Sequence, residues 1–349
     1  MKHFSLSEWI ARNRWIWSLL GVLILWTILS AMTSQFTLSS LSGVAVTGAF
    51  LTLVALGQMA VVTTGGGNID LSIASVMTLS AFIALIVVAG HDGRIVFGVI
   101  ATLALGLVVG ALNAALVIVL RIPAIIATLA TGYVLATASL LANRAIPGFV
   151  IPPALRMIAT ARIAGFPIMA ALALVAVVAA SLILNRTAYG RCLSAVGQNA
   201  VAARLAGVRV ERVTAAAFVA SSVLAAFAGL LQGAYVGGAF LEMGQPFLLQ
   251  SLGAVVLGGT LIFGGAGTAV GTLFGAVLLV LIVTTMQIAK LPPGTQDVVE
   301  GVVIIAVLAL AGGGSILRQR AKRPRGPDQP AAADAARRQA PGGHRFSRR

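Results

Sequence analysis

Long apolar segments make up most of this chain, and short polar or glycine-rich segments separate them. The apolar segments approach 20 residues and do not alternate with a period of two, so they predict transmembrane helices and not the strands of a membrane barrel. The eighth is short for a full crossing, and we expect it to be tilted, broken or re-entrant. The ten predicted spans lie near residues 15–33, 43–63, 72–90, 95–120, 124–142, 166–184, 214–234, 250–263, 268–289 and 297–316.

One long interior segment, residues 185–213, is too polar to cross a membrane. Within it, Asn199 is a good helix N-cap, residues 200–206 are mostly strong helix formers, and Gly207 suits the left-handed position after a helix. Because a helix of two turns is marginal alone in water, it must pack either on a partner protein or on the chain's own membrane domain. The helix has one small apolar face, formed by Val201, Leu205 and Val208.

The composition is that of an integral membrane protein. The 349 residues are 59% hydrophobic and 9% charged, with a mean hydropathy of +1.01, whereas soluble domains carry about 25% charged residues. The net charge of +15 does not indicate nucleic-acid binding, because the basic residues lie in loops and termini, as membrane orientation requires. With both termini cytoplasmic, 19 of the 24 Lys and Arg residues lie inside, and the five outside are Arg94, Arg144, Arg156, Arg162 and Lys290.

Charge and composition also divide the chain into three parts. Residues 1–14 form a cytoplasmic N-terminus, and residues 15–316 form the membrane domain, with residues 185–213 as its long cytoplasmic loop. The tail, residues 317–349, is rich in Arg, Pro and Ala without an apolar period, so we expect it to be disordered. Its basic residues reinforce the orientation and are suited to contact with anionic membrane lipid.

Several kinds of catalytic and ion-coupling site are missing from the sequence. No lysine follows a GxxxxG run, so there is no phosphate-binding P-loop, and no metal-ligand spacing, HExxH or nucleophile elbow is present. The acids Asp70 and Glu300 lie near span ends, and the three histidines fall outside the spans. Because proton relays in membranes are built from ionisable groups at depth, we expect neither an enzyme nor an ion-coupled carrier, and no metal or cofactor bound by the chain itself.

A glycine-rich turn, GGGNIDLS at residues 65–72, separates the second and third spans. Gly65 and Gly66 permit a tight turn or the close approach of another helix. The polar residues Asn68 and Asp70, or the serine that follows, would cap the third span, and this is a sufficient explanation for them. The alternative is that the broken backbone and its polar groups line part of a translocation path.

A second glycine-rich turn, LGGTLIFGGAG at residues 257–267, joins the eighth and ninth spans. Glycine at this density favours close helix packing, and it also permits hinge motion. The turn assigns a hinge or packing role to Gly258, Gly259, Gly264 and Gly265, alongside the two glycines of the first turn.

Neutral polar residues lie inside several predicted spans. Such groups suit an uncharged polyol cargo, which needs hydrogen-bond donors and acceptors but no counter-ion. The alternative for each is an interhelical hydrogen bond, worth ~0.6 to 2 kcal/mol. With the polar residues of the first glycine turn, the candidate substrate path comprises Gln58, Asn68, Asp70, Asn113, Thr131 and Tyr133.

Three separated motifs resemble those of one family. They are GGNIDLS at residues 66–72, RTAYGRCLSAVGQNAVAARLAGV at residues 186–208 and VVLGGTLIFGGAGTAVGTLFGA at residues 255–276. Over residues 15–316 the chain resembles the membrane subunits of bacterial ATP-binding-cassette (ABC) importers of the ribose, xylose and galactoside class. The Asp-Leu-Ser of the first motif is closer to this sugar branch than to the related branched-chain amino-acid permeases.

The resemblance implies a non-catalytic, all-α ABC importer permease with ten transmembrane helices and both termini cytoplasmic, in the bacterial cytoplasmic membrane. It further implies pairing with an identical or sister permease, cytoplasmic ATPase subunits that bind ATP and Mg, and an extracytoplasmic binding protein that delivers a ribose-like sugar. Segment 185–213 then resembles the segment that couples the permease to the ATPase, through Gly197, Asn199, Ala202, Ala203, Arg204 and Gly207.

Two alternatives remain at this stage. The first is the same machinery with another cargo: a branched-chain amino acid, a nucleoside or an autoinducer-like furanose. The second is a facilitator or ion-coupled carrier that works alone. The scarcity of charge inside the spans and the basic, helix-bearing loop at residues 185–213 both disfavour the second.

Overall fold

A computed structural model describes residues 15–33, 38–145, 148 and 150–322 of the chain. The chain divides into two units, residues 1–311 and residues 312–349, and the described part of the second, residues 312–322, is helical. The elements in chain order are α2 (Ile16–Thr33), α3 (Leu38–Thr63), α4 (Ile73–Val88), η1 (Asp92–Arg94), α5 (Ile95–Ile118), α6 (Ala124–Ala145), α7 (Pro153–Thr160), β1 (Arg162–Ile163), β2 (Phe166–Pro167), α8 (Ile168–Arg186), α9 (Ala188–Gln198), α10 (Ala200–Leu205), α11 (Val210–Val236), α12 (Gln245–Leu257), α13 (Ala269–Ile288) and α14 (Pro293–Lys322).

A helix lies at each of the ten predicted spans. The 13 residues of α12 extend only about 20 Å, short of the ~30 Å hydrocarbon core, so the eighth predicted span does not cross as a single helix. Three apolar helices, α2, α4 and α12, contain stretches of 10–17 residues. Among the described residues, six helices are long and apolar enough to cross a membrane, at Ser42–Thr63, Asp92–Ile118, Ala124–Arg144, Ile168–Arg186, Val210–Val236 and Ala269–Ile288.

The predicted tail begins at a different place in the structure. We expected disorder from residue 317, whereas α14 continues to Lys322. The rest of the predicted tail, residues 323–349, and the predicted N-terminal segment, residues 1–14, lie outside the described residues.

Two long helices, α3 and α11, form the interior of the first unit. The apolar window of α3 is 83% buried, against 17% for that of α8. Small residues allow the two interior helices to approach closely, since a Cβ added at Gly57 would lie 2.7 Å from the Cα of Ser221. Around them, α5, α6 and α8 turn leucine, isoleucine and valine outward, which is the surface that faces lipid or another subunit in a membrane.

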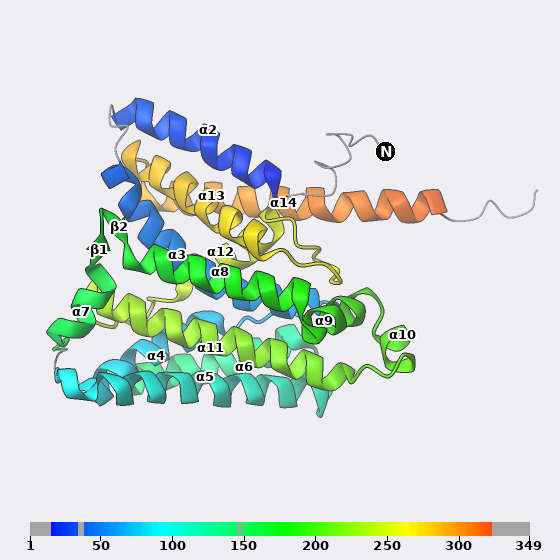
Figure 1. The fold of residues 1–349 in the computed structure, drawn as a ribbon, viewed down its shortest axis with the longest axis horizontal. Coiled ribbons are helices and arrows are strands. Elements are labelled where there is room, and N and C mark those ends of the chain that lie inside the picture. Colours follow the sequence, from blue (N-terminus) through cyan, green and yellow to red (C-terminus); the bar gives the residue numbers. More distant parts are fainter. Residues whose placement is uncertain (1–14, 34–37, 146–147, 149, 323–349) are drawn as a thin grey trace, which may run out of the picture. The chain divides into compact units, whose positions relative to one another are not determined.

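The two ends of the helix bundle carry different structures (Figure 1). At one end α9 and α10 connect α8 to α11, and we call this the α10 end. At the other end lie α7 and the antiparallel hairpin β1–β2, in which Ile163 pairs with Phe166. The α10 end also holds the turns after α3 and before α13, because both turns contact Gly197 of α9. The Gly265 N–H joins the two turns by donating to the Thr63 carbonyl at 3.0 Å.

Candidate functional site

The short helix predicted in segment 185–213 is present as α10. The Asn199 carboxamide oxygen accepts hydrogen bonds from the backbone N–H groups of Val201 and Ala202, both at 3.0 Å, and so caps the helix start as predicted. Gly207 has a φ of +84° and ends the turn, donating its N–H to the Arg204 carbonyl at 3.0 Å.

A second helix, α9, precedes it and was not foreseen. Its N-cap is Thr187, whose hydroxyl oxygen accepts from the Gly190 N–H at 3.2 Å. The signal was present in the sequence: Tyr189, Leu193 and Val196 recur at i, i+4 and i+7, which is the spacing of one buried helix face.

The buried face fixes α9 to the bundle. Leu193 and Val196 are buried in a cluster with Val61 and Phe218, on α3 and α11. The Tyr189 hydroxyl donates to the Val213 carbonyl at 3.4 Å. Burial raises the pKa of the Tyr189 phenol to about 12, because the charged phenolate loses solvation. Helix α9 is therefore held against α3 and α11, and it fixes the position at which α10 begins.

The apolar face of α10 is split between the chain and solvent. Val208, after the helix, packs against the cluster under α9, whereas Val201 is 67% exposed and Leu205 is 86% exposed. An ion pair between Arg204 and Glu211, both exposed, links α10 to α11 and contributes little to stability, because solvent screens it. The described residues leave most of both side chains uncovered, which favours the partner-protein interpretation of this helix.

The other residues assigned to the coupling segment lie on two helices, Ala202 and Ala203 on α10 and Gly197 on α9. Ala202 is exposed beside Leu205, and Ala203 is buried on the opposite side of α10. Gly197 lies in the last turn of α9, where it meets both glycine-rich turns. The three sequence motifs therefore converge at the α10 end.

The glycines assigned to hinge or packing roles divide by their surroundings. A Cβ added at Gly258 would lie 2.4 Å from the carbonyl carbon of Gly271, so Gly258 permits α12 and α13 to pack closely. Gly66 and Gly259 have positive φ, at +67° and +87°, which suits tight turns. Gly65, Gly264 and Gly265 combine positive φ with close backbone contacts.

A buried polar cluster lies inside the bundle behind these turns, and its centre is Asp70. One carboxylate oxygen of Asp70 accepts from the Ser72 N–H at 3.0 Å and from the Ser72 hydroxyl at 2.6 Å. The other accepts from the Ser221 hydroxyl, on α11, at 2.8 Å. Asp70 thus organises the turn before α4 but does not cap the helix as expected, because the N-cap is Ser72 and no side chain makes a capping hydrogen bond there. The Asp70 side chain is also fully buried, which was not expected.

Three further helices contribute to the cluster. Gln58, on α3, accepts the Asp70 N–H at 3.3 Å, and Asn113, on α5, donates to the Ser72 hydroxyl at 2.8 Å. Thr128, on α6, accepts the N–H of Leu71 at 2.9 Å. Among the described residues, the Gln58 Nε2 and the Asn113 Oδ1 are buried without a hydrogen-bond partner, so the cluster retains one donor and one acceptor.

The structure therefore joins three of the six candidate path residues, Gln58, Asp70 and Asn113, and separates the other three. Asn68 is half-buried and donates to the Thr64 hydroxyl at 2.9 Å. Thr131 bonds to the Ala127 carbonyl of its own helix, and Tyr133 is 69% exposed on the outer side of α6. Sequence reasoning missed Ser221 as a member of the cluster, because a serine in an apolar helix commonly bonds only to its own helix.

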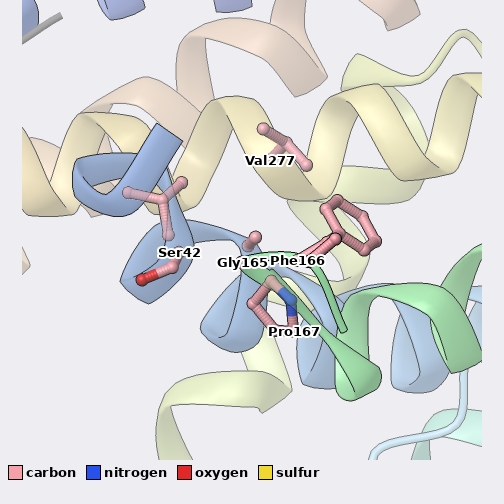
Figure 2. A pocket seen from close by; sticks show the side chains of 8 residues that line it. Ser42, Gly165, Phe166, Pro167 and Val277 are labelled. Carbon is pink, nitrogen blue, oxygen red and sulfur yellow. The ribbon is translucent and has the colours of Figure 1, made fainter. Parts of the chain in front are cut away.

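An apolar pocket lies at the other end of the bundle, between the start of α3, the turn of the hairpin and α13 (Figure 2). Phe166, Pro167 and Val277 line it, and Ser42 supplies the polar side chain. A polyol would find few hydrogen-bonding groups there, so this pocket is not the site that the polar residues predict.

Comparisons with known proteins agree with the motifs. Residues 40–308 match the family described as branched-chain amino acid transport system / permease component. The autoinducer 2 import system permease protein LsrC of Klebsiella pneumoniae is 34% identical over 306 residues, which are 87% of this chain and 88% of that protein. Its counterpart in Escherichia coli K12 is 31% identical over 309 residues, 87% of this chain and 89% of that protein. No solved structure matches the chain significantly.

Proposed function

The chain belongs to the family of branched-chain amino acid transport system permease components, and we propose that it is the membrane subunit of an ATP-driven importer for a ribose-like monosaccharide. It is a multi-pass membrane protein whose role is transport. The observation that carries the proposal is the exposed face of α10, which is formed by Leu205 and Val201. Asn199 caps this helix, and α9 precedes it and is packed on the bundle. A face of this kind supports docking of an ATPase subunit.

The polar cluster supports a neutral, hydroxyl-bearing cargo. A sugar hydroxyl both donates and accepts, and the cluster retains one donor, on Gln58, and one acceptor, on Asn113. The cluster is enclosed in this conformation, so it would meet cargo only when the helices around it separate. Asp70 is the acidic group at its centre, and a carboxyl group accepts hydrogen bonds from hydroxyls.

An autoinducer-like furanose is the second candidate cargo. The relatives that cover most of this chain carry the name of autoinducer 2 import permeases, and such a compound presents the same hydroxyl chemistry as a sugar. A branched-chain amino acid, which the family description names, fits less well. Its carboxylate would need a cation or helix terminus, whereas the ionisable member of the described cluster is an acid, Asp70.

We assign ten transmembrane segments to the chain. The distribution of Lys and Arg places both termini and segment 185–213 on the cytoplasmic side in this assignment. A second permease subunit, identical or related, would complete the pore, and an extracytoplasmic binding protein would deliver the cargo. ATP and Mg would bind the ATPase, whose closure moves α10. The work of this chain is then the differential stabilisation of outward-open and inward-open states.

The test is gentle purification of the tagged chain from its native membranes, with co-purifying proteins identified and quantified by mass spectrometry. We expect a P-loop ATPase in near-stoichiometric amount, and reconstitution of that complex should give ATP-dependent uptake of a labelled ribose-like sugar. A preparation that contains no ATPase, even after crosslinking, would contradict the proposal. Uptake by this chain alone in liposomes without ATP would instead support a stand-alone carrier, and uptake of the furanose in preference to the sugar would select the second cargo.

A further inference from the structure

Three backbones that are far apart in the sequence touch one another at the α10 end. They are the turn after α3 at Gly65, the last turn of α9 at Gly197, and the turn before α13 at Gly264 and Gly265. We call these four residues the glycine junction. One hydrogen bond crosses it directly, from the Gly265 N–H to the Thr63 carbonyl at 3.0 Å.

The junction leaves no room for side chains. A Cβ added at Gly197 would lie 1.9 Å from the Thr63 carbonyl oxygen and 2.3 Å from the Gly265 nitrogen. A Cβ at Gly264 would lie 2.3 Å from the Gly65 Cα, and a Cβ at Gly65 would lie 2.7 Å from the Gly197 carbonyl oxygen. These neighbours are backbone atoms, which cannot rotate away as a flexible side chain can. Close-packed contacts of this kind transmit displacement because they do not deform continuously.

Backbone conformation does not explain the glycine at position 197. It lies within α9, and its φ is not in the left-handed region that favours glycine. Glycine in a helix costs about 1 kcal/mol relative to alanine. Close approach to Thr63 and Gly265 is therefore the physical reason for glycine there.

The junction lies between the docking helix and the polar cluster. On one side, α9 passes directly through Asn199 into α10, with its exposed Leu205. On the other side, the chain runs from Gly65 to Asp70 in five residues and enters the cluster, where Asp70 bonds to Ser221. Segment 64–72 is therefore held at one end by α9 and at the other by α5, α6 and α11.

We propose that Gly197 is a positioning residue for transport: it seats α9 against segment 64–72, so that a movement of α10 displaces Asp70 from Ser221 and opens the polar cluster. The inference rests on the proposed function, because ATPase docking at α10 is its source of movement. It assigns to the junction the transfer of that movement, and not the docking itself. The docking face and the junction are consequently separable by mutation.

The test compares Gly197→Ala with Gly43→Ala in the reconstituted complex. Gly43 is also helical, and among the described residues no atom beyond its own helix backbone and chain neighbours lies within 4 Å of an added Cβ, so it reports the effect of the substitution without the clash. In the Gly197→Ala complexes that retain the ATPase, we expect the cargo moved per ATP hydrolysed to fall about tenfold, within the range of measured coupling changes. Gly43→Ala should match the unmodified chain, and an unchanged ratio in Gly197→Ala would overturn the inference.

A labelling measurement reports the movement itself. Cys192 is the only cysteine of the chain, so a Cys192→Ser background allows a single reporter, Asn68→Cys, in segment 64–72. In the reconstituted complex, the rate at which the reporter thiol is alkylated should change when ATP is added, and Gly197→Ala should abolish that change. A purely structural role would alter assembly or melting temperature but leave the ATP response of the assembled complexes intact, and that result would refute the inference.

A milder variant covers the case in which Gly197→Ala does not assemble. The Gln198 side chain lies across Gly265, with its Nε2 donating to the Gly265 carbonyl at 3.5 Å. Gln198→Ala loosens the junction without adding bulk, and we expect the cargo moved per ATP to fall about two- to threefold. An unchanged ratio in this assembled variant would overturn the inference. Failure of the unmodified chain to bind any ATPase would instead overturn the proposed function, so the two failures are distinguishable.

Discussion

Replacing Leu205 with alanine tests whether α10 docks a partner. Leu205 is 86% exposed, so a partner surface that covers it removes nearly the whole side chain from water. Burial of a leucine side chain is worth ~1.5–3 kcal/mol, and alanine retains only the Cβ. We therefore expect Leu205→Ala to weaken docking by about 2 kcal/mol, which is a rise of roughly 30-fold in the Kd for the ATPase.

The assay is a titration of the ATPase onto the purified chain in lipid nanodiscs, with the melting temperature measured in parallel. Because Leu205 is exposed and alanine is a good helix former, the free energy of unfolding should change by less than ~0.5 kcal/mol. Leu241→Ala is the control, since Leu241 is another exposed leucine outside α10. A Kd for Leu205→Ala within threefold of the unmodified value, with the fold intact, would refute the assignment of α10 as the docking helix.

Three further predictions concern the parts around the docking face. Asn199→Ala removes two capping hydrogen bonds, so it should weaken ATPase binding about fivefold through a loss of ~1 kcal/mol in helix stability. Asn199→Asp keeps an acceptor at the cap and should bind the ATPase normally. Equal ATPase affinities for Asn199→Ala and the unmodified chain in the same titration would count against the cap. Ser221→Ala leaves the buried Asp70 carboxylate without one donor and should lower the free energy of unfolding by ~1–3 kcal/mol in denaturant titrations, and an unchanged midpoint would contradict the hydrogen bond. Because the pKa of Tyr189 is about 12 in the folded chain and about 10 in an unfolded one, the unfolded state binds fewer protons between these values and stability should fall as the pH rises through them. Tyr189→Phe should remove the part of the fall in stability that the phenol causes between these pH values. Identical stability profiles against pH for the two chains would show that burial does not raise the pKa of Tyr189.

The helices of the membrane domain and the short helix of segment 185–213 could be predicted from the sequence. Helix positions followed from the length of the apolar runs, which the bilayer thickness fixes locally. The α10 cap followed from Asn199, and the left-handed end from Gly207, because both depend on neighbouring residues only. Helix α9 was not predicted from the sequence, because its apolar face is short and adjoins polar residues.

The polar cluster could be predicted only in part. Gln58, Asp70 and Asn113 were candidates because polar groups are costly in an apolar segment, and the structure brings them together. Tyr133 was a candidate on the same grounds, yet it faces outward. Composition does not reveal which side of a helix turns inward, since that depends on the packing of neighbouring helices.

The sequence by itself determined that the chain is a helical membrane protein with a polar, helix-bearing loop and two glycine-rich turns. Only the tertiary structure decided that Leu205 is left exposed, that Asp70 is enclosed with Ser221, and that Gly65, Gly197 and Gly264 meet. The physical reason is the range of the interactions. Hydropathy and helix capping act within one or two turns of the chain, whereas burial and backbone contact depend on segments that are distant in the sequence, such as Asp70 and Ser221 or Gly65 and Gly197.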